Sequence, residues 1–140
     1  MATWTCPDCG RRFGRRNAGH VCAPAMTLEE WLATSPPHER PVAERLIEAV
    51  AELPDAWVEP VQVGLFVKRS STFCALRTMT RWTALSLKLP RVVTAPEPDR
   101  KVQSQGIVHH HTWNLRRPED LTDELIGLLG ESYDFDAPRR

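Results

Sequence analysis

Four side chains near the start of the chain have the types and the spacing of a zinc site. Cys6 and Cys9 stand three positions apart, and Gly10 follows them directly. A turn of this length points two thiolates at one ion, and the glycine takes up the backbone strain. His20 and Cys22 are two positions apart, so their side chains share a face in an extended segment. The sequence predicts a closed, structural Zn2+ site made of Cys6, Cys9, His20 and Cys22.

Two cysteines at this spacing also occur in redox-active proteins. That chemistry belongs to a thioredoxin-like βαβ unit, which residues 1–24 are too short to form. We therefore expect a zinc-binding module over residues 1–24, in which the metal supplies most of the stability, roughly 10–16 kcal/mol in zinc-finger peptides. The fourth cysteine, Cys74, is alone in a predicted strand, and we expect a small buried apolar residue rather than a nucleophile.

Four arginines lie between the two halves of the predicted zinc site, namely Arg11, Arg12, Arg15 and Arg16. Metal binding would hold both ends of this segment, so the side chains would be presented on a stiff loop. Arginine pairs with phosphate in a bidentate geometry. The segment is therefore a candidate site for nucleic acid or another anionic partner. Docking of these arginines on the acidic helices of the same chain is the alternative.

The chain is neutral as a whole, with 18 basic and 18 acidic residues among 140, but its charges are segregated. Residues 61–117 carry ten basic and two acidic residues, a net charge of +8, whereas residues 118–138 carry seven acidic residues and no basic one. Residues 27–60 are acidic as well, with a net charge of −6. Zero net charge argues against a strong general nucleic-acid binder, whereas the segregation indicates differently charged surfaces.

Capping and periodicity predict the elements that position these residues. Thr27 and Glu30 form a capping box for a first helix, and helical spacing continues over 38–52. The period then changes to two, which predicts strands near 57–63, 64–69, 72–79, 82–89 and 106–115. A proline-rich loop over 90–104 precedes the last strand, and a final helix runs from Pro118 to Gly130. We expect an α+β domain over residues 27–131, with a mostly antiparallel sheet and helices on one face, and a flexible tail over 132–140.

One face of the predicted sheet collects cations and aromatic rings. Alternation places Lys68, Arg77 and Lys88 opposite the apolar side, together with Phe66, Phe73, Met79, Trp82 and Ser86. Rings can stack on bases and cations can pair with phosphates, so this face suits single-stranded nucleic acid. It suits a small anionic ligand equally well. An ordinary solvated sheet face is the remaining interpretation.

Three consecutive histidines occupy the last predicted strand. Alternation places His109 and His111 on one face and His110 on the other. Imidazole groups can bind a metal, transfer protons or contact phosphate. One hypothesis is therefore a pocket under the proline-rich loop, lined by His109 and His111 with Arg77 and Lys88. Histidines satisfied by local hydrogen bonds are the alternative.

Two parts of the chain resemble known families. The segment from Trp4 to Phe13, with His20 and Cys22, resembles a small zinc ribbon found at the start of some actinobacterial proteins. The rest resembles the bacterial family of domain of unknown function 5655, in the segments Val42 to Val50, Lys68 to Leu89, Ile107 to Trp113 and Leu115 to Leu125. This resemblance implies a compact α+β domain akin to the fold of YdhG-like proteins. It implies no established activity and hence no catalytic residue.

Several function classes are disfavoured by what the sequence lacks. No apolar run approaches the roughly 20 residues of a membrane helix, and the first residues have no secretory pattern, so we expect a cytoplasmic protein without membrane contact. No Ser-His-Asp or paired-carboxylate arrangement is recognisable. We therefore expect a non-enzymatic, zinc-binding module for nucleic acid or another anionic partner. A small-ligand-binding or catalytic domain is the alternative, and a protein partner is a third hypothesis.

Overall fold

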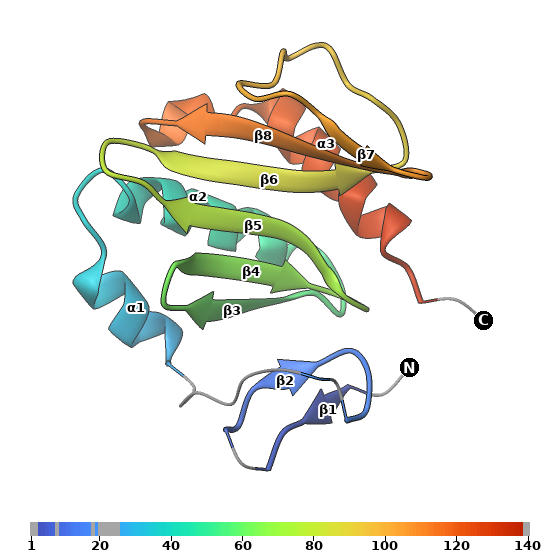
Figure 1. The fold of residues 1–140 in the computed structure, drawn as a ribbon. Coiled ribbons are helices and arrows are strands. Elements are labelled where there is room, and N and C mark those ends of the chain that lie inside the picture. Colours follow the sequence, from blue (N-terminus) through green and yellow to red (C-terminus); the bar gives the residue numbers. More distant parts are fainter. Residues whose placement is uncertain (1–2, 8, 18, 20–25, 139–140) are drawn as a thin grey trace.

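The main body of the molecule is a six-stranded antiparallel sheet backed by helices (Figure 1). The structure, a computed structural model, describes residues 3–7, 9–17, 19 and 26–138. The strands lie side by side in the order β3-β4-β5-β6-β8-β7. The expected α+β class with an antiparallel sheet is therefore confirmed.

Consecutive strands of the sheet are joined by short turns and pair as hairpins. The first four are β3 (Trp57–Val61), β4 (Gly64–Lys68), β5 (Thr72–Thr78) and β6 (Thr83–Leu89). β8 (Val108–Leu115) pairs with every residue of β6. At the edge, β7 (Gln103–Gln105) pairs with the start of β8. Gln103 and Ser104 of β7 lie in the segment 90–104 that we expected to be a loop, and Gln105 lies just beyond it. The three residues are all polar and show no alternation that would predict a strand.

The first helix begins where its capping signal predicts, whereas the last helix begins at Asp123 and not at Pro118 as expected. α1 (Leu28–Thr34) starts after Thr27, whose Oγ1 accepts a hydrogen bond from the Glu30 N–H at 3.1 Å. α2 (Arg40–Ala51) follows, with a proline in its first turn, where no intrahelical N–H is needed. A single 3-10 turn (Pro118–Asp120) leads into α3 (Asp123–Phe135).

The last helix extends further than the sequence indicates. α3 continues through Gly130, which we expected to end it, and the expected tail is therefore wrong for residues 132–136. Ser132 is fully buried, and its hydroxyl donates to the backbone oxygen of Lys88 at 2.6 Å. The Tyr133 hydroxyl donates to the Pro54 carbonyl at 2.6 Å. These tertiary contacts outweigh the roughly 1 kcal/mol that a glycine costs inside a helix.

α2 and α3 cover one face of the sheet and leave the other face open. Figure 1 looks onto the open face, with both helices behind the sheet. The buried core between the layers consists mainly of leucine and valine side chains, including Leu46, Val50, Leu76, Leu85, Leu125 and Leu129. The helices are thus on one face, as expected, and the open face is available for binding.

A small hairpin at the start of the chain covers the β3 edge of the open face (Figure 1). It consists of β1 (Trp4–Thr5) and β2 (Arg12–Phe13). Gly14 follows β2 and lies so close to the β4–β5 turn that a Cβ atom there would stand 1.9 Å from the Ser70 carbonyl oxygen. The hairpin therefore packs directly against the α+β domain.

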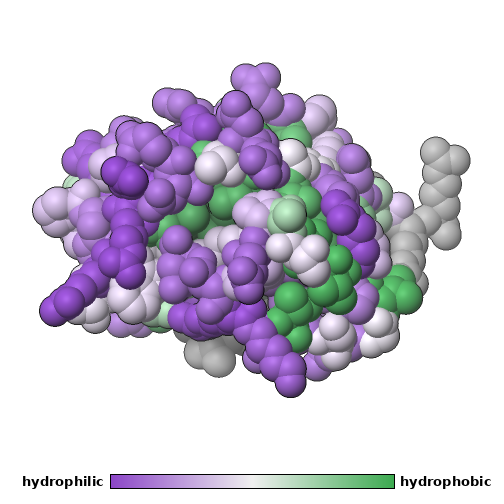
Figure 2. Space-filling model, turned by 90° about the horizontal axis from the view of Figure 1, so that it is seen from above, coloured by the Kyte–Doolittle hydropathy of each residue, from purple (hydrophilic) through white to green (hydrophobic). Residues whose placement is uncertain are grey.

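Among the described residues, the helices are too short or too polar to cross a membrane. Seen from above, the surface is mainly hydrophilic, with a strip of hydrophobic atoms across its middle (Figure 2). The large exposed apolar residues are Val63, Val92 and Ile107, which lie in turns and loops.

Candidate functional site

Cys6 and Cys9 of the predicted zinc site lie in the tight turn that joins β1 to β2. Both are buried, with 3% and 8% of their surfaces exposed. The Gly10 N–H donates to the Cys6 carbonyl at 2.8 Å, and Gly10 has a φ of +74°, the conformation that glycine adopts readily. This half of the site fits a metal knuckle. His20 and Cys22 lie outside the described residues, and the described residues alone contain no group of three metal-binding side chains.

Two of the four clustered arginines dock on strand β3. Arg11 Nε donates to Glu59 Oε1 at 2.7 Å. The Arg12 guanidinium lies over the Trp57 ring, 4.1 Å from its centroid. The other two arginines of the cluster are exposed. Arg11 therefore docks on the same chain, as the alternative predicts, but its counter-charge, Glu59, lies on strand β3 and not on a helix.

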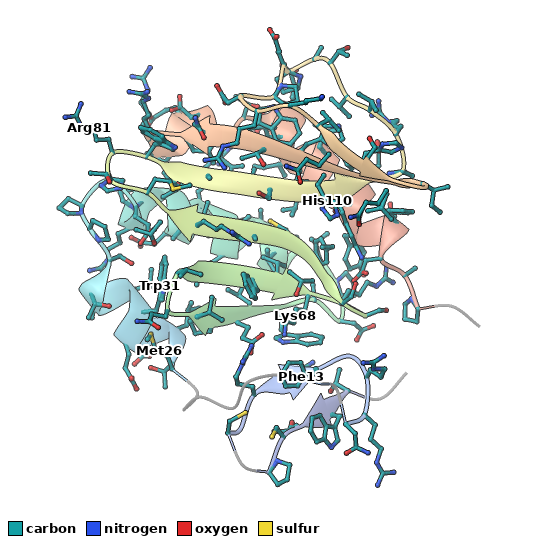
Figure 3. All side chains as sticks on the ribbon, in the orientation of Figure 1. Phe13, Met26, Trp31, Lys68, Arg81 and His110 are labelled. Carbon is teal, nitrogen blue, oxygen red and sulfur yellow. The ribbon has the colours of Figure 1, made fainter. Side chains whose placement is uncertain are left out.

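Lys68 lies under the hairpin and is not exposed on the open face. Its side chain is 7% exposed, forms an ion pair with Glu59 Oε2 and lies 4.5 Å from the centre of the Phe13 ring (Figure 3). Glu59, with 8% of its side chain exposed, thus bridges Lys68 and Arg11. A buried carboxylate is retained only where cations compensate it. The expected contribution of Lys68 to a binding face is therefore wrong, because this ion triad fixes it at the junction with the hairpin.

The remainder of the open face is hollowed over β5, β6 and β8. Its floor is made of small side chains. Ala75, Ser86 and Thr112 lie side by side on the three strands, and Ala84 lies one row away on β6. Phe66 from β4 stands at one side. The hollow has a volume of about 470 Å³, which lies within the usual range of ligand sites, about 300–1,000 Å³. It is large enough for a small organic molecule.

Cationic side chains surround this hollow, and none of the described lining residues is acidic. Arg77 comes from β5, Lys88 from β6, and Arg100 and Lys101 from the loop between β6 and β7. Arg77, Arg100 and Lys101 are exposed and have no ion-pair partner among the described residues. Their uncompensated charges converge on one concave site, which therefore attracts anions.

Lys88 is the exception among these cations, because Asp136 neutralises it. Lys88 Nζ lies 2.7 Å from Asp136 Oδ1 and donates to Ser71 Oγ at 2.7 Å. The Asp136 carboxylate also accepts from the Ser70 and Ser71 N–H groups, at 2.9 and 3.0 Å. Burial alone would raise the pKa of Asp136, but the hydrogen bonds from Lys88 and Ser71 outweigh it and lower that pKa. Lys88 therefore forms a fixed wall of the hollow.

The loop that carries the two further cations is anchored along β8. The Asp99 N–H donates to the Thr112 carbonyl at 2.9 Å, and Asp99 Oδ2 accepts from the Asn114 N–H at 2.8 Å. Trp113 Nε1 donates to the Pro96 carbonyl at 3.1 Å. The cations that follow Asp99 are therefore held before a ligand arrives, which reduces the entropy lost on binding.

His111 is a core residue and does not line the hollow. It is fully buried, and its ring stacks on Trp113 with centroids 5.6 Å apart. Nε2 accepts from the Val93 N–H at 2.8 Å, so the proton is on Nδ1, which donates to the His109 carbonyl at 3.0 Å. Burial lowers the pKa of His111 and keeps the ring neutral.

The hypothesis that His109 and His111 line a pocket is therefore wrong, because neither of them lines the hollow. His109 Nδ1 is hydrogen-bonded to Ser104 Oγ at 2.6 Å, as the alternative of local hydrogen bonds predicts. His110 instead lines the hollow, because β8 pairs it with Lys88 (Figure 3). Arg77 and Lys88 line the same hollow, as expected, but the histidine that lines it with them is His110.

The alternation of apolar residues along β8 could have shown from the sequence which of the three histidines faces the core. Trp113 and Leu115 alternate in step with His111 and are the most apolar residues of the strand, which indicates that His111 faces the core. Arg100 and Lys101 also escaped the sequence analysis. They form a basic pair in a loop, and periodicity carries no information on where a loop side chain points.

Cys74 is buried as expected, with 1% of its surface exposed. Burial raises the pKa of its thiol, so the reactive thiolate is suppressed. Cys74 therefore contributes packing and no nucleophile to the neighbouring hollow.

These features define a small α+β protein whose antiparallel sheet has one helix-covered face and one open, cation-lined face. The family model described as domain of unknown function (DUF5655) matches residues 29–136. The chain therefore belongs to the DUF5655 family, as the resemblance implied. No curated protein and no solved structure matches the chain.

Proposed function

We propose that this protein is a non-enzymatic binding module that takes an anionic ligand in the cation-lined hollow of its open sheet face. The observation that carries the proposal is the convergence of Arg77, Arg100 and Lys101 on one hollow with no acidic lining residue among those described. Uncompensated cations are costly to hold together, so a site of this kind is stabilised by an anion.

Two further observations support binding rather than catalysis. Among the described residues the lining contains no carboxylate, its imidazole, His110, has no hydrogen-bond partner that would orient it as a general base, and the Cys74 thiol is held protonated by burial. The anchored loop presents its cations on a fixed backbone, which favours affinity. The hollow thus has the features of a binding site for a negatively charged ligand.

Nucleic acid is a second candidate partner, and the exposure of Arg15 and Arg16 favours it. Their side chains are accessible at the hairpin, whereas Arg11, Arg12 and Lys68 are engaged with the sheet. A nucleic acid held mainly by the hairpin would not depend on the hollow, so substitutions separate the two candidates.

We further propose that residues 1–24 form a structural zinc ribbon with Cys6, Cys9, His20 and Cys22 as ligands, in a cytoplasmic protein whose α+β domain is akin to the YdhG-like fold. The support for the metal is the buried cysteine pair in its tight turn. Purified protein should contain one zinc ion per chain by elemental analysis. A Cys6→Ser variant that keeps full metal content would contradict the ligand assignment.

Calorimetric titration with inorganic pyrophosphate tests the anion site. We expect wild-type protein to bind at about 50 mM salt and to bind more weakly as salt rises. A hollow variant with Arg77→Ser, Arg100→Ser and Lys101→Ser should lose at least about tenfold in affinity, since each lost charge-assisted contact weakens binding. A matched control, Arg15→Ser with Arg16→Ser and Arg81→Ser, removes the same charge elsewhere and should bind as wild type does.

The same variants also define the result that would contradict the proposal. Pyrophosphate binding that is equal in the hollow variant and the wild type would overturn it. Fluorescence anisotropy with a single-stranded oligonucleotide of about 12 nucleotides then tests the second candidate. A loss of oligonucleotide binding confined to the control variant, and retained when only Arg15 and Arg16 are replaced, would assign the function to the hairpin arginines.

A further inference from the structure

We infer that the ligand of the hollow is a nucleoside phosphate, bound as a single small molecule with its phosphate at the cations and its planar ring beside Phe66. This inference rests on the proposed function and adds the chemical class of the ligand. The structural basis is the different chemistry of the sides of the hollow.

The apolar part of the hollow fits a planar ring. Phe66 is half-buried at one side, and the neighbouring floor positions on the central strands are Ala75 and Ala84. Ala75 and Ala84 keep only 9% and 1% of their surfaces exposed, so the Phe66 ring stands above them as the apolar surface that a planar ligand would meet. Nucleobases stack on aromatic side chains over such surfaces of β-sheets.

The polar part of the floor fits the hydroxyl groups of a sugar. Ser86 Oγ and Thr112 Oγ1 lie 3.2 Å apart and share one hydrogen bond. Each hydroxyl can donate one hydrogen bond and accept two, so the pair retains capacity toward the hollow. A ligand with hydroxyl groups would use this capacity, whereas a purely apolar acid would leave it unused.

The charged part of the hollow fits a phosphate better than a carboxylate. Arg77, Arg100 and Lys101 give three uncompensated cations, and a phosphate monoester carries close to two negative charges near neutral pH. The two arginines can each form bidentate hydrogen bonds with phosphate oxygens. A single carboxylate would leave most of this charge uncompensated.

The surroundings of the hollow favour a compact ligand over a polymer. Toward the hairpin, the open-face cations are occupied, with Lys68 paired to Glu59 and Arg12 stacked on Trp57. Next to the β5–β6 turn, the Arg116 guanidinium lies over the Trp82 ring, 5.5 Å from its centroid. Exposed cations outside the hollow, such as Arg81 and Arg15, lie in the β5–β6 turn and after β2 and not on the strands of the open face, so a long nucleic-acid strand would find no continuous cationic track along these strands.

Calorimetric titrations of the full-length protein with adenosine monophosphate, adenosine and inorganic phosphate test this inference. We expect adenosine monophosphate to bind at least about fivefold more tightly than either fragment, because only it meets both the ring and the cations. A Phe66→Leu variant should weaken adenosine monophosphate about 5-fold to 100-fold, a larger factor than for pyrophosphate, which has no ring to stack. The melting temperature of the variant, followed by circular dichroism, is the control that it is folded.

The outcomes separate the ligand class from the proposed function. If adenosine monophosphate binds no more tightly than inorganic phosphate, the ligand class is wrong, while pyrophosphate binding at the hollow would still support the anion site. If an oligonucleotide binds at the hollow and adenosine monophosphate does not displace it, the ligand is a polymer and the inference fails. If none of the phosphate compounds binds, both proposals fail together.

Discussion

Replacing Asp136 with asparagine should destabilise the protein substantially, although Asp136 is a single carboxylate at the end of α3. A negative charge at a helix C-terminus is unfavourable by itself, because it faces the negative end of the helix dipole. The four hydrogen bonds that Asp136 accepts must therefore more than compensate. All four are charge-assisted, because the acceptor is a carboxylate, and the two shortest reach Oδ1, at 2.6 Å from Ser71 Oγ and 2.7 Å from Lys88 Nζ.

The size of the effect follows from these contacts. A hydrogen bond to a charged group contributes about 1.5–3 kcal/mol. The amide of Asp136→Asn can still accept from a backbone N–H, and Lys88, with 19% of its side chain exposed, can turn partly to water. We therefore expect a loss of about 2–3 kcal/mol in the free energy of unfolding, since one of the two contacts to Oδ1 is lost outright and the other is weakened. For a chain of this length that loss lowers the melting temperature by roughly 6–10 °C.

Equilibrium unfolding in urea, followed by circular dichroism, measures this difference. The control is Asp134→Asn, which removes the same charge from an exposed position in the same turn of α3. It should change the stability by less than about 0.5 kcal/mol. Equal stability of the two variants would refute the account of Asp136 as the residue that ties α3 to the β4–β5 turn.

The pH dependence of the same difference gives a second check. Because the pKa of Asp136 is lowered in the folded protein, its contribution is present above the unfolded pKa, about 3.9. The contribution is lost as the pH falls through the folded pKa. The stability difference between wild type and Asp136→Asn should therefore be full at pH values near 7 and shrink in strong acid.

Three further predictions concern other buried groups. Glu59→Gln should cost about 3–5 kcal/mol in urea unfolding, because it leaves the buried Lys68 and the partly buried Arg11 without a counter-charge; a loss below about 1 kcal/mol would contradict the ion triad. Because burial lowers the pKa of His111, stability should fall as the pH drops below about 6.5. His111→Leu should therefore lose about 1–3 kcal/mol at neutral pH and distinctly less in mild acid; an equal loss at both would contradict a neutral ring. Wild type and Cys74→Ala should label equally with a thiol reagent when native and differ by one thiol when unfolded; native labelling of Cys74 would contradict its burial.

Local signals in the sequence were sufficient to predict most of the fold. Thr27 and Glu30 mark the start of α1 because the cap requires only neighbouring residues. The five longer strands follow from alternation. The end of α3 could not be predicted, because the residues after Gly130 become helical through contacts with the distant Phe73 and Lys88.

The candidate site was only partly predictable, for the same physical reason. Arg77 and Lys88 could be assigned to one face because alternation along a strand is local. Lys68 does not contribute to that face, because it pairs with Glu59 and contacts a hairpin more than 50 positions away. Periodicity does not encode a long-range contact of this kind. The uncompensated charge of Arg100 likewise depends on where the anchored loop lies.

Chemical-shift mapping by NMR tests the central claim most directly, because it locates the bound anion. Isotope-labelled wild-type protein is titrated with adenosine monophosphate at low salt, and the backbone amide shifts are followed. The account predicts saturable shifts concentrated around the hollow, at Phe66, Arg77, Ser86, Lys101 and His110. Shifts confined to Arg15, Arg16 and their neighbours in the hairpin, or no saturable shifts at all, would contradict it.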